Sequence, residues 1–162
     1  MLLEEIPGEL ILNWDQTVIR FVASSTWTME RRGERRVEMI GVNDKRQITA
    51  VFCGSASGEF LPVQLIYIGK TARHPRYLFP PEWNITHHWS NEDTMEEYVD
   101  NIILPYVEKV REKVGAEKAA LVIMDNFKGQ TTTKITNRLE ENNILISWLP
   151  PNTTDCNRWI FQ

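Results

Sequence analysis

The sequence predicts an α/β domain with a mixed sheet, in which three antiparallel strands precede a helix, a strand, a second helix and a last strand. Three observations predict this class. Short apolar runs separated by turn residues fill the first part of the chain, a long amphipathic pattern follows, and Ala119–Asp125 is apolar until its final acid. The composition, 42% hydrophobic and 25% charged, is that of a folded globular chain and excludes wholesale disorder.

The strands of the first part are short. Leu10–Asp15 is typical of a buried strand that ends on a carboxylate. Val37–Val42 and Gln47–Cys53 alternate, and the turn residues Asn43 and Asp44 between them predict a hairpin. The next strand is expected within Phe60–Ile68.

Proline and turn residues interrupt the chain after this hairpin. Pro62 lies inside Phe60–Ile68, which predicts an edge strand or two short pieces, because proline cannot donate to a sheet. From Gly69 to Asn91 the sequence holds further prolines and has no clear period, so we expect irregular structure there.

A helix is expected after this stretch. Thr94 and Glu97 have the spacing of a capping box, which predicts the helix start, and Gly115 predicts its end. Pro105 falls inside the pattern and predicts a kink or two abutting helices. The apolar residues recur every three or four positions: Met95, Val99, Ile102, Tyr106, Val110 and Val114.

The last part of the chain alternates strand and helix. Ala119–Asp125 is typical of a central strand buried on both faces. Thr131–Asn142 predicts a short helix with Ile135 and Leu139 facing the core. Ile144–Leu149 predicts the last strand, which stops at two prolines.

Charge and cysteine content restrict the class of protein. Eighteen basic and 22 acidic residues give a net charge of −4, which argues against a free-standing protein that coats nucleic acid, so any DNA contact must be local or assisted. No apolar run is long enough to span a bilayer, and Glu4 and Glu5 stand where a secretory signal carries positive charge. Cys53 and Cys156 fit a reducing compartment. We expect an intracellular domain without membrane partners.

Asp15 and Asp125 are the candidate site residues, because each ends a buried apolar run. If their strands are parallel neighbours, both carboxylates emerge at one rim of the sheet. Paired carboxylates can hold Mg²⁺ for phosphoryl transfer, usually with a third acid. The alternative is that each aspartate is only a polar cap that begins a loop.

Other polar residues are weaker candidates. Arg31, Arg32, Arg35 and Arg36 form a basic patch that could follow a DNA backbone; the alternative is a solvated loop partly neutralised by nearby glutamates. The three histidines and two cysteines have no zinc-site spacing, so we expect the histidines to be exposed or to serve packing.

The sequence resembles the DDE superfamily endonuclease domain of pogo/Tigger-type transposases. The resemblance runs in order from about Glu4 to Asp155. It is carried by seven segments: Ile11–Thr17, Asp44–Ala50, Gly58–Pro62, His88–Glu92, Ile103–Val107, Met124–Gln130 and Leu149–Asp155. It places an incomplete domain at 4–155 and a divergent tail at 156–162.

This resemblance implies an RNase H-like fold and metal-dependent cleavage and transfer of DNA strands in the nucleus. It implies that Asp15 and Asp125 are the first two catalytic acids, which bind Mg²⁺ or Mn²⁺. DNA is the implied partner, bound weakly here because the family's helix-turn-helix region has no counterpart in the sequence.

The sequence departs from the family at its end. The resemblance places the third acid near position 161, where this sequence has Phe161, and the last helix is missing. We therefore expect activity far below that of a complete enzyme. The alternative is a non-catalytic, domesticated remnant that binds nucleic acid or protein. An uncovered sheet face would also favour marginal folding or self-association.

Overall fold

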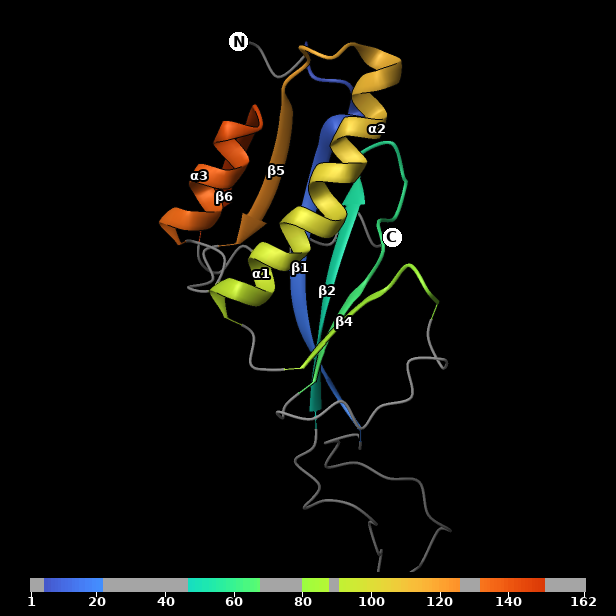
Figure 1. The fold of residues 1–162 in the computed structure, drawn as a ribbon, viewed down its shortest axis with the longest axis vertical. Helices are drawn as coiled ribbons and strands as arrows, with labels where there is room; N and C mark the ends of the chain where they lie inside the picture. Colours follow the sequence, from blue (N-terminus) through green and yellow to red (C-terminus); the bar gives the residue numbers. More distant parts are fainter. Residues whose placement is uncertain (1–4, 22–46, 68–79, 88–90, 126–131, 151–162) are drawn as a thin grey trace, which may run out of the picture.

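The computed structural model describes residues 5–21, 47–67, 80–87, 91–125 and 132–150. These residues form one six-stranded sheet in the order β4-β3-β2-β1-β5-β6, with helices packed against it (Figure 1). The strands are β1 (Ile11–Arg20), β2 (Gln47–Ser55), β3 (Gln64–Tyr67), β4 (Asn84–His87), β5 (Ala120–Asp125) and β6 (Ile144–Leu149). The helices are α1 (Glu92–Tyr98), α2 (Leu104–Val114) and α3 (Thr133–Glu141).

The sheet is mixed, as the sequence predicted. β1, β2 and β3 pair antiparallel in succession, whereas β1 pairs parallel with β5, and β5 pairs parallel with β6. β1 therefore lies inside the sheet between β2 and β5. Apolar contacts on both sides fix its register, which matters because a one-residue slip would turn every side chain to the other face.

One prediction for the first half of the chain needs correction. β4 lies in the stretch that we expected to be irregular, and it pairs parallel with β3. Its four residues are too few to produce a periodic signal, so only the pairing reveals the strand. β3 begins at Gln64, after Pro62, which supports the interruption predicted there. The predicted strand at 37–42 and its turn lie outside the described residues.

The helix start was also predicted wrongly. Asn91, not Thr94, is the N-cap: its side chain accepts a hydrogen bond from the Thr94 backbone N–H at 3.0 Å. Thr94 Oγ1 accepts one from the Asn91 N–H at 3.0 Å. This reciprocal capping box uses a threonine at the position where glutamate is more usual.

Pro105 divides the long helical stretch into two helices, as predicted. A π-helical turn at Val99–Ile103 joins α1 to α2, and Pro105 is the second residue of α2, where its missing N–H costs little. Gly115 ends α2 with a φ of 122°, which favours glycine. None of the described helices is long and apolar enough to cross a membrane.

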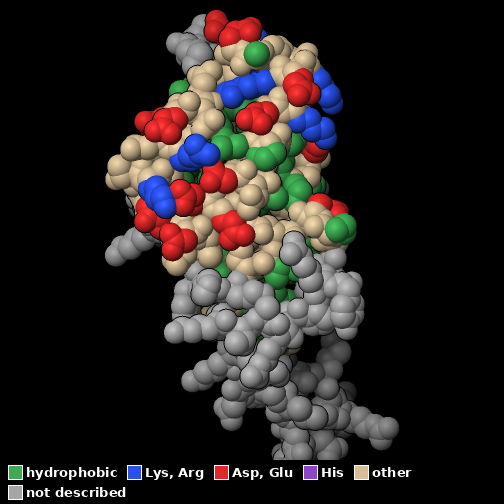
Figure 2. All heavy atoms as spheres, in the orientation of Figure 1, with side chains coloured by type: hydrophobic (Ala, Val, Ile, Leu, Met, Phe, Trp, Pro, Cys, Tyr) green, Lys and Arg blue, Asp and Glu red, His purple; other side chains and the backbone are tan. Residues whose placement is uncertain are grey.

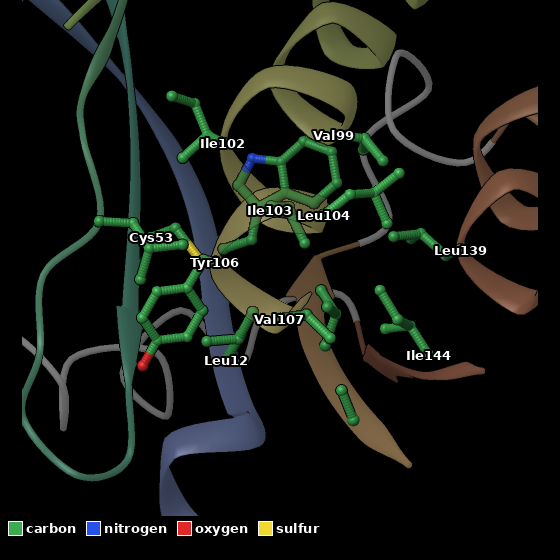
Figure 3. Packing of buried hydrophobic residues seen from close by; sticks show 14 of the residues in the cluster. Leu12, Cys53, Val99, Ile102, Ile103, Leu104, Tyr106, Val107, Leu139 and Ile144 are labelled. Carbon is green, nitrogen blue, oxygen red and sulfur yellow. The ribbon is translucent and has the colours of Figure 1, made fainter. Parts of the chain in front are cut away.

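The main core lies between the sheet and the helices, which all pack on one face (Figure 1). Trp14 of β1 and Tyr98 of α1 are fully buried with ring centroids 5.7 Å apart. Ile135 and Leu139 of α3 are fully buried too, as predicted. Figure 3 shows Leu12, Cys53, Val99, Ile103, Val107, Leu139 and Ile144 converging in this cluster.

A smaller apolar cluster occupies the opposite face of the sheet. Ile48, Ala50, Leu65 and Tyr67 are buried there. The two clusters fit the period of two in β2 and β3, because successive side chains point to opposite faces.

Arg111 of α2 ties three segments together at the end of the sheet where β5 and β6 begin. Its guanidinium donates hydrogen bonds to the backbone oxygens of Lys118, Asn142 and Asn143, at 2.8, 2.9 and 2.9 Å. The first acceptor precedes β5, and the other two lie in the turn between α3 and β6. One side chain thus fixes where both parallel strands start.

We predict that Arg111→Ala lowers the free energy of unfolding by about 2 kcal/mol, because three charge-assisted hydrogen bonds are lost. Arg111→Lys should recover little, since an ammonium cannot reproduce the planar fork. Urea denaturation measures both. Lys109→Ala, at an exposed position of the same helix, is the control and should change stability by less than about 0.5 kcal/mol. An Arg111→Ala variant as stable as the control would contradict this role.

Candidate functional site

The structure brings Asp15 and Asp125 together at one rim of the sheet. The last residue pair of the β1–β5 ladder is Trp14 with Met124, so the two aspartates are the next residues on neighbouring parallel strands. Both are half-buried. They lie on the face opposite the helices, because Trp14 and Met124 point into the helix-covered core. Asp125 ends its strand as predicted, whereas β1 continues past Asp15 to Arg20.

The chain leaves the two strands in different directions at this rim of the sheet. Among the described residues, β1 beyond Trp14 pairs only with β2, so the chain leaves the β1–β5 pair on the β2 side. From β5 the chain passes through α3 to β6, on the other side. Strand ends that diverge in this way are the usual place for ligand sites in open α/β sheets.

The electrostatics of the pair favour a bound cation. Burial raises the pKa of Asp15, and the charge of Asp125 raises it further. The backbone N–H of Gln16 opposes both effects by donating a hydrogen bond to Asp15 Oδ1 at 2.8 Å. Two neighbouring carboxylates in a partly desolvated place repel each other, and a hard divalent ion would relieve this repulsion. The donor set therefore fits Mg²⁺ or Mn²⁺.

The described residues supply only two acids here. Among them, no group of three histidine, cysteine, aspartate or glutamate side chains is arranged to hold a metal ion. Position 161, where the resemblance places a third acid, lies outside the described residues. So do Arg31, Arg32, Arg35 and Arg36.

The cysteines and histidines give little support to a different site. Cys53 is buried in β2, and burial raises the pKa of its thiol, so it is a packing residue and not a thiolate ligand. Cys156, His74 and His88 lie outside the described residues. His87 belongs to β4.

Three neighbours of the pair were not predicted from the sequence. Phe52 is the register partner of Asp15 on β2, and Leu149 is the partner of Asp125 on β6, so apolar positions flank the acids. Asn13, two residues before Asp15 on the same face, is fully buried. A polar residue inside an apolar run was the available signal for Asn13; the flanking residues have none before the strands are paired.

The face covered by helices carries net negative charge. From 92 to 114 and from 133 to 141 there are nine acidic and five basic residues. Figure 2 shows acidic and basic side chains interspersed over this face. Lys134 pairs with Glu96 at 2.6 Å and Arg138 with Asp100 at 2.9 Å, so two of the basic residues serve to join α3 to α1 and the π-helical turn.

Two adjacent carboxylates at the rim of a parallel strand pair have the oxygen donors that a divalent ion prefers. The family model described as DDE superfamily endonuclease matches residues 45–158, which is more than half of the chain. The chain therefore belongs to the DDE superfamily endonuclease family. The matched range includes Asp125 and begins after Asp15. No curated protein matches the chain.

Solved structures of the Mos1 transposase share the fold. The paired-end complex with the left transposon end is 13% identical, with a TM-score of 0.55 over 86% of this chain and 35% of that chain. The pre-cleavage transpososome is 12% identical, with a TM-score of 0.56 over 85% and 35%. The mariner paired-end complex with Mn is 13% identical, with a TM-score of 0.56 over 86% and 36%. The chain spans about a third of these chains, and the expected RNase H-like fold is confirmed.

We predict that Asp15→Asn stabilises the metal-free protein at neutral pH by less than about 1 kcal/mol, a modest value because a half-exposed carboxylate is screened by solvent. The folded-state pKa of Asp15 is raised. The contribution of Asp15 to the free energy of unfolding is therefore fully present below its unfolded-state pKa and is lost as pH rises through its folded-state pKa. The stability difference between variant and wild type should therefore grow from pH 4 to pH 7.

Urea denaturation across this pH range, in the presence of a chelator, measures the difference. Glu112→Gln, at an exposed position of α2, is the control for removing a charge from an acidic protein. An Asp15→Asn variant that gains no stability relative to wild type between pH 4 and pH 7 would contradict the electrostatic description of the pair.

Proposed function

We propose that this chain is a transposase-derived endonuclease core of the pogo/Tigger type, in which Asp15 and Asp125 are catalytic acids that bind Mg²⁺ or Mn²⁺. The observation that carries the proposal is the parallel register of β1 and β5, which sets the two carboxylates next to each other. Membership of the DDE superfamily endonuclease family supports it. We place the domain at 4–155 and its site of action in the nucleus.

The residues of the site would have different roles. Asp15 and Asp125 would hold the ion, and the Gln16 N–H keeps one oxygen of Asp15 oriented. When bound, the metal supplies Lewis-acid activation of the attacking and leaving oxygens at a phosphodiester. Phe52 and Leu149, the register partners of the acids, would limit the water around the carboxylates. Exclusion of water strengthens the interaction between these carboxylates and a cation.

DNA is the proposed substrate and partner. Two of the structures that share the fold are described as complexes with a transposon end or as a strand-transfer complex. The net negative charge of the helix-covered face disfavours a phosphate backbone there, so DNA would approach the face that carries Asp15. Arg31, Arg32, Arg35 and Arg36 lie in the sequence between β1 and β2, outside the described residues, and are the proposed basic contact.

We propose that catalysis by these 162 residues is far weaker than that of a three-acid enzyme, because Phe161 stands where the resemblance places the third ligand. A second candidate function is a non-catalytic, domesticated module that binds nucleic acid or protein, including a second copy of itself. The same missing acid favours it. Both candidate functions allow the two aspartates to bind a metal ion without DNA cleavage. Metal binding and cleavage therefore need separate tests.

We predict that the wild-type protein binds Mn²⁺ and that Asp15→Asn and Asp125→Asn each weaken this binding at least about tenfold, since one carboxylate ligand is removed. Electron paramagnetic resonance of free Mn²⁺ during titration measures the affinity. Glu112→Gln should bind like wild type. Absence of Mn²⁺ binding by the wild-type protein would overturn the proposed site.

We predict that supercoiled plasmid incubated with Mn²⁺ shows little or no nicking by the wild-type protein. Conversion to open circles is followed on gels, with Asp15→Asn and Asp125→Asn as controls for contaminating nuclease. Robust nicking that Asp15→Asn abolishes would show that two acids suffice and that the proposed inactivity is wrong. Nicking that both variants retain would come from a contaminant.

We predict that the protein binds DNA at low salt and that replacing Arg31, Arg32, Arg35 and Arg36 by glutamine weakens binding. The slope of log affinity against log salt should fall by up to about 4, because each phosphate contact contributes about one. Fluorescence anisotropy of a labelled duplex measures it. The control replaces Lys109 and Lys113 of the acidic helix face. Equal loss in both variants would contradict a local basic contact.

A further inference from the structure

We infer that Trp14 is a positioning residue for Asp15. Its packing sets the position of the Asp15 carboxylate relative to Asp125, so that the two carboxylates can share a divalent ion. This inference deepens the proposed function and rests on it. The register of the sheet places Trp14 and Met124, both fully buried, one residue before the two acids on β1 and β5.

Two rows of side chains lie at neighbouring positions of the sheet, on opposite faces. The row on the helix-covered face is set by register partners: Cys53, Trp14, Met124 and Trp148, on β2, β1, β5 and β6. The adjacent residue on each of these strands points to the other face. These residues form the second row: Phe52, Asp15, Asp125 and Leu149. Each acid therefore follows a core residue of its own strand.

Trp14 and Met124 are the two members of the first row that precede an acid, and both are fully buried. Met124 is a flexible side chain that adapts to its surroundings, whereas the indole is rigid and large. Trp14 packs against Tyr98, whose hydroxyl donates a hydrogen bond to the Pro62 backbone oxygen at 3.1 Å. The position of the indole is thus fixed from α1 and from the segment before β3.

Trp14 also has a feature that packing alone does not require. Within the described part of the chain, its Nε1 has no hydrogen-bond partner, although the atom is buried. A buried donor without a partner destabilises the fold, and phenylalanine would fill much of this volume without that cost. The use of tryptophan is explained if its width, and not its contribution to stability, sets where β1 lies between the helices and the acids.

The experiment compares Trp14→Phe with wild type by Mn²⁺ titration and thermal melting. We expect the melting midpoint to change by no more than about 5 °C, because loss of contacts and loss of the unpartnered N–H oppose each other. The dissociation constant for Mn²⁺ should rise on the order of tenfold, as for other residues that orient a metal ligand. Cys53→Ala, in the same row but next to Phe52 instead of an acid, should leave Mn²⁺ binding unchanged.

Tyr98→Leu is the second variant. It removes the ring against which Trp14 packs without altering β1, and it should weaken Mn²⁺ binding in the same direction. Folded variants at both positions that bind Mn²⁺ like wild type would overturn the inference and leave the proposed function intact. If neither variant folds, Trp14 serves folding alone and the inference is wrong. A wild-type protein without Mn²⁺ affinity would overturn the proposed function itself.

Discussion

The parallel pairing of β1 with β5 is the constraint on which the rest of the structure depends. It joins two segments that are far apart in the sequence and makes Asp15 and Asp125 neighbours. Parallel neighbours need a long connection, which the helices α1 and α2 help to supply, and these helices cover the face away from the acids. β2 holds the other edge of β1, so the register that aligns the acids is fixed from both sides.

Alternation along a strand couples the core to the site. Because neighbouring side chains point to opposite faces, the packing of Trp14 and Met124 determines where the two carboxylates lie. The site in turn acts against the fold, since burial and mutual repulsion raise the pKa of Asp15. Local features that oppose stability are expected at functional sites, where a bound ion or substrate offsets them.

Much of the fold could be predicted because its signals are local. The apolar run of β5, the inward residues Ile135 and Leu139, the proline at the start of α2 and the glycine that ends α2 each act within a few residues. The errors have a physical reason as well. β4 can be recognised only by its pairing with β3. Asn91 and Thr94 can both cap a helix, and only the hydrogen bond from the Thr94 backbone N–H to the Asn91 side chain shows that Asn91 caps α1.

The sequence by itself determined the order of the elements other than β4, the mixed sheet and the two aspartates at the ends of buried runs, because these follow from hydrophobic period and residue chemistry. Only the tertiary structure decided that β1 and β5 lie in register, that Phe52 and Leu149 flank the acids, and that Trp14 lies behind Asp15. Strand pairing and register depend on the burial of whole sheet faces, which is a sum of contacts between residues distant in the sequence. The sequence of one strand therefore does not show which strand it pairs with.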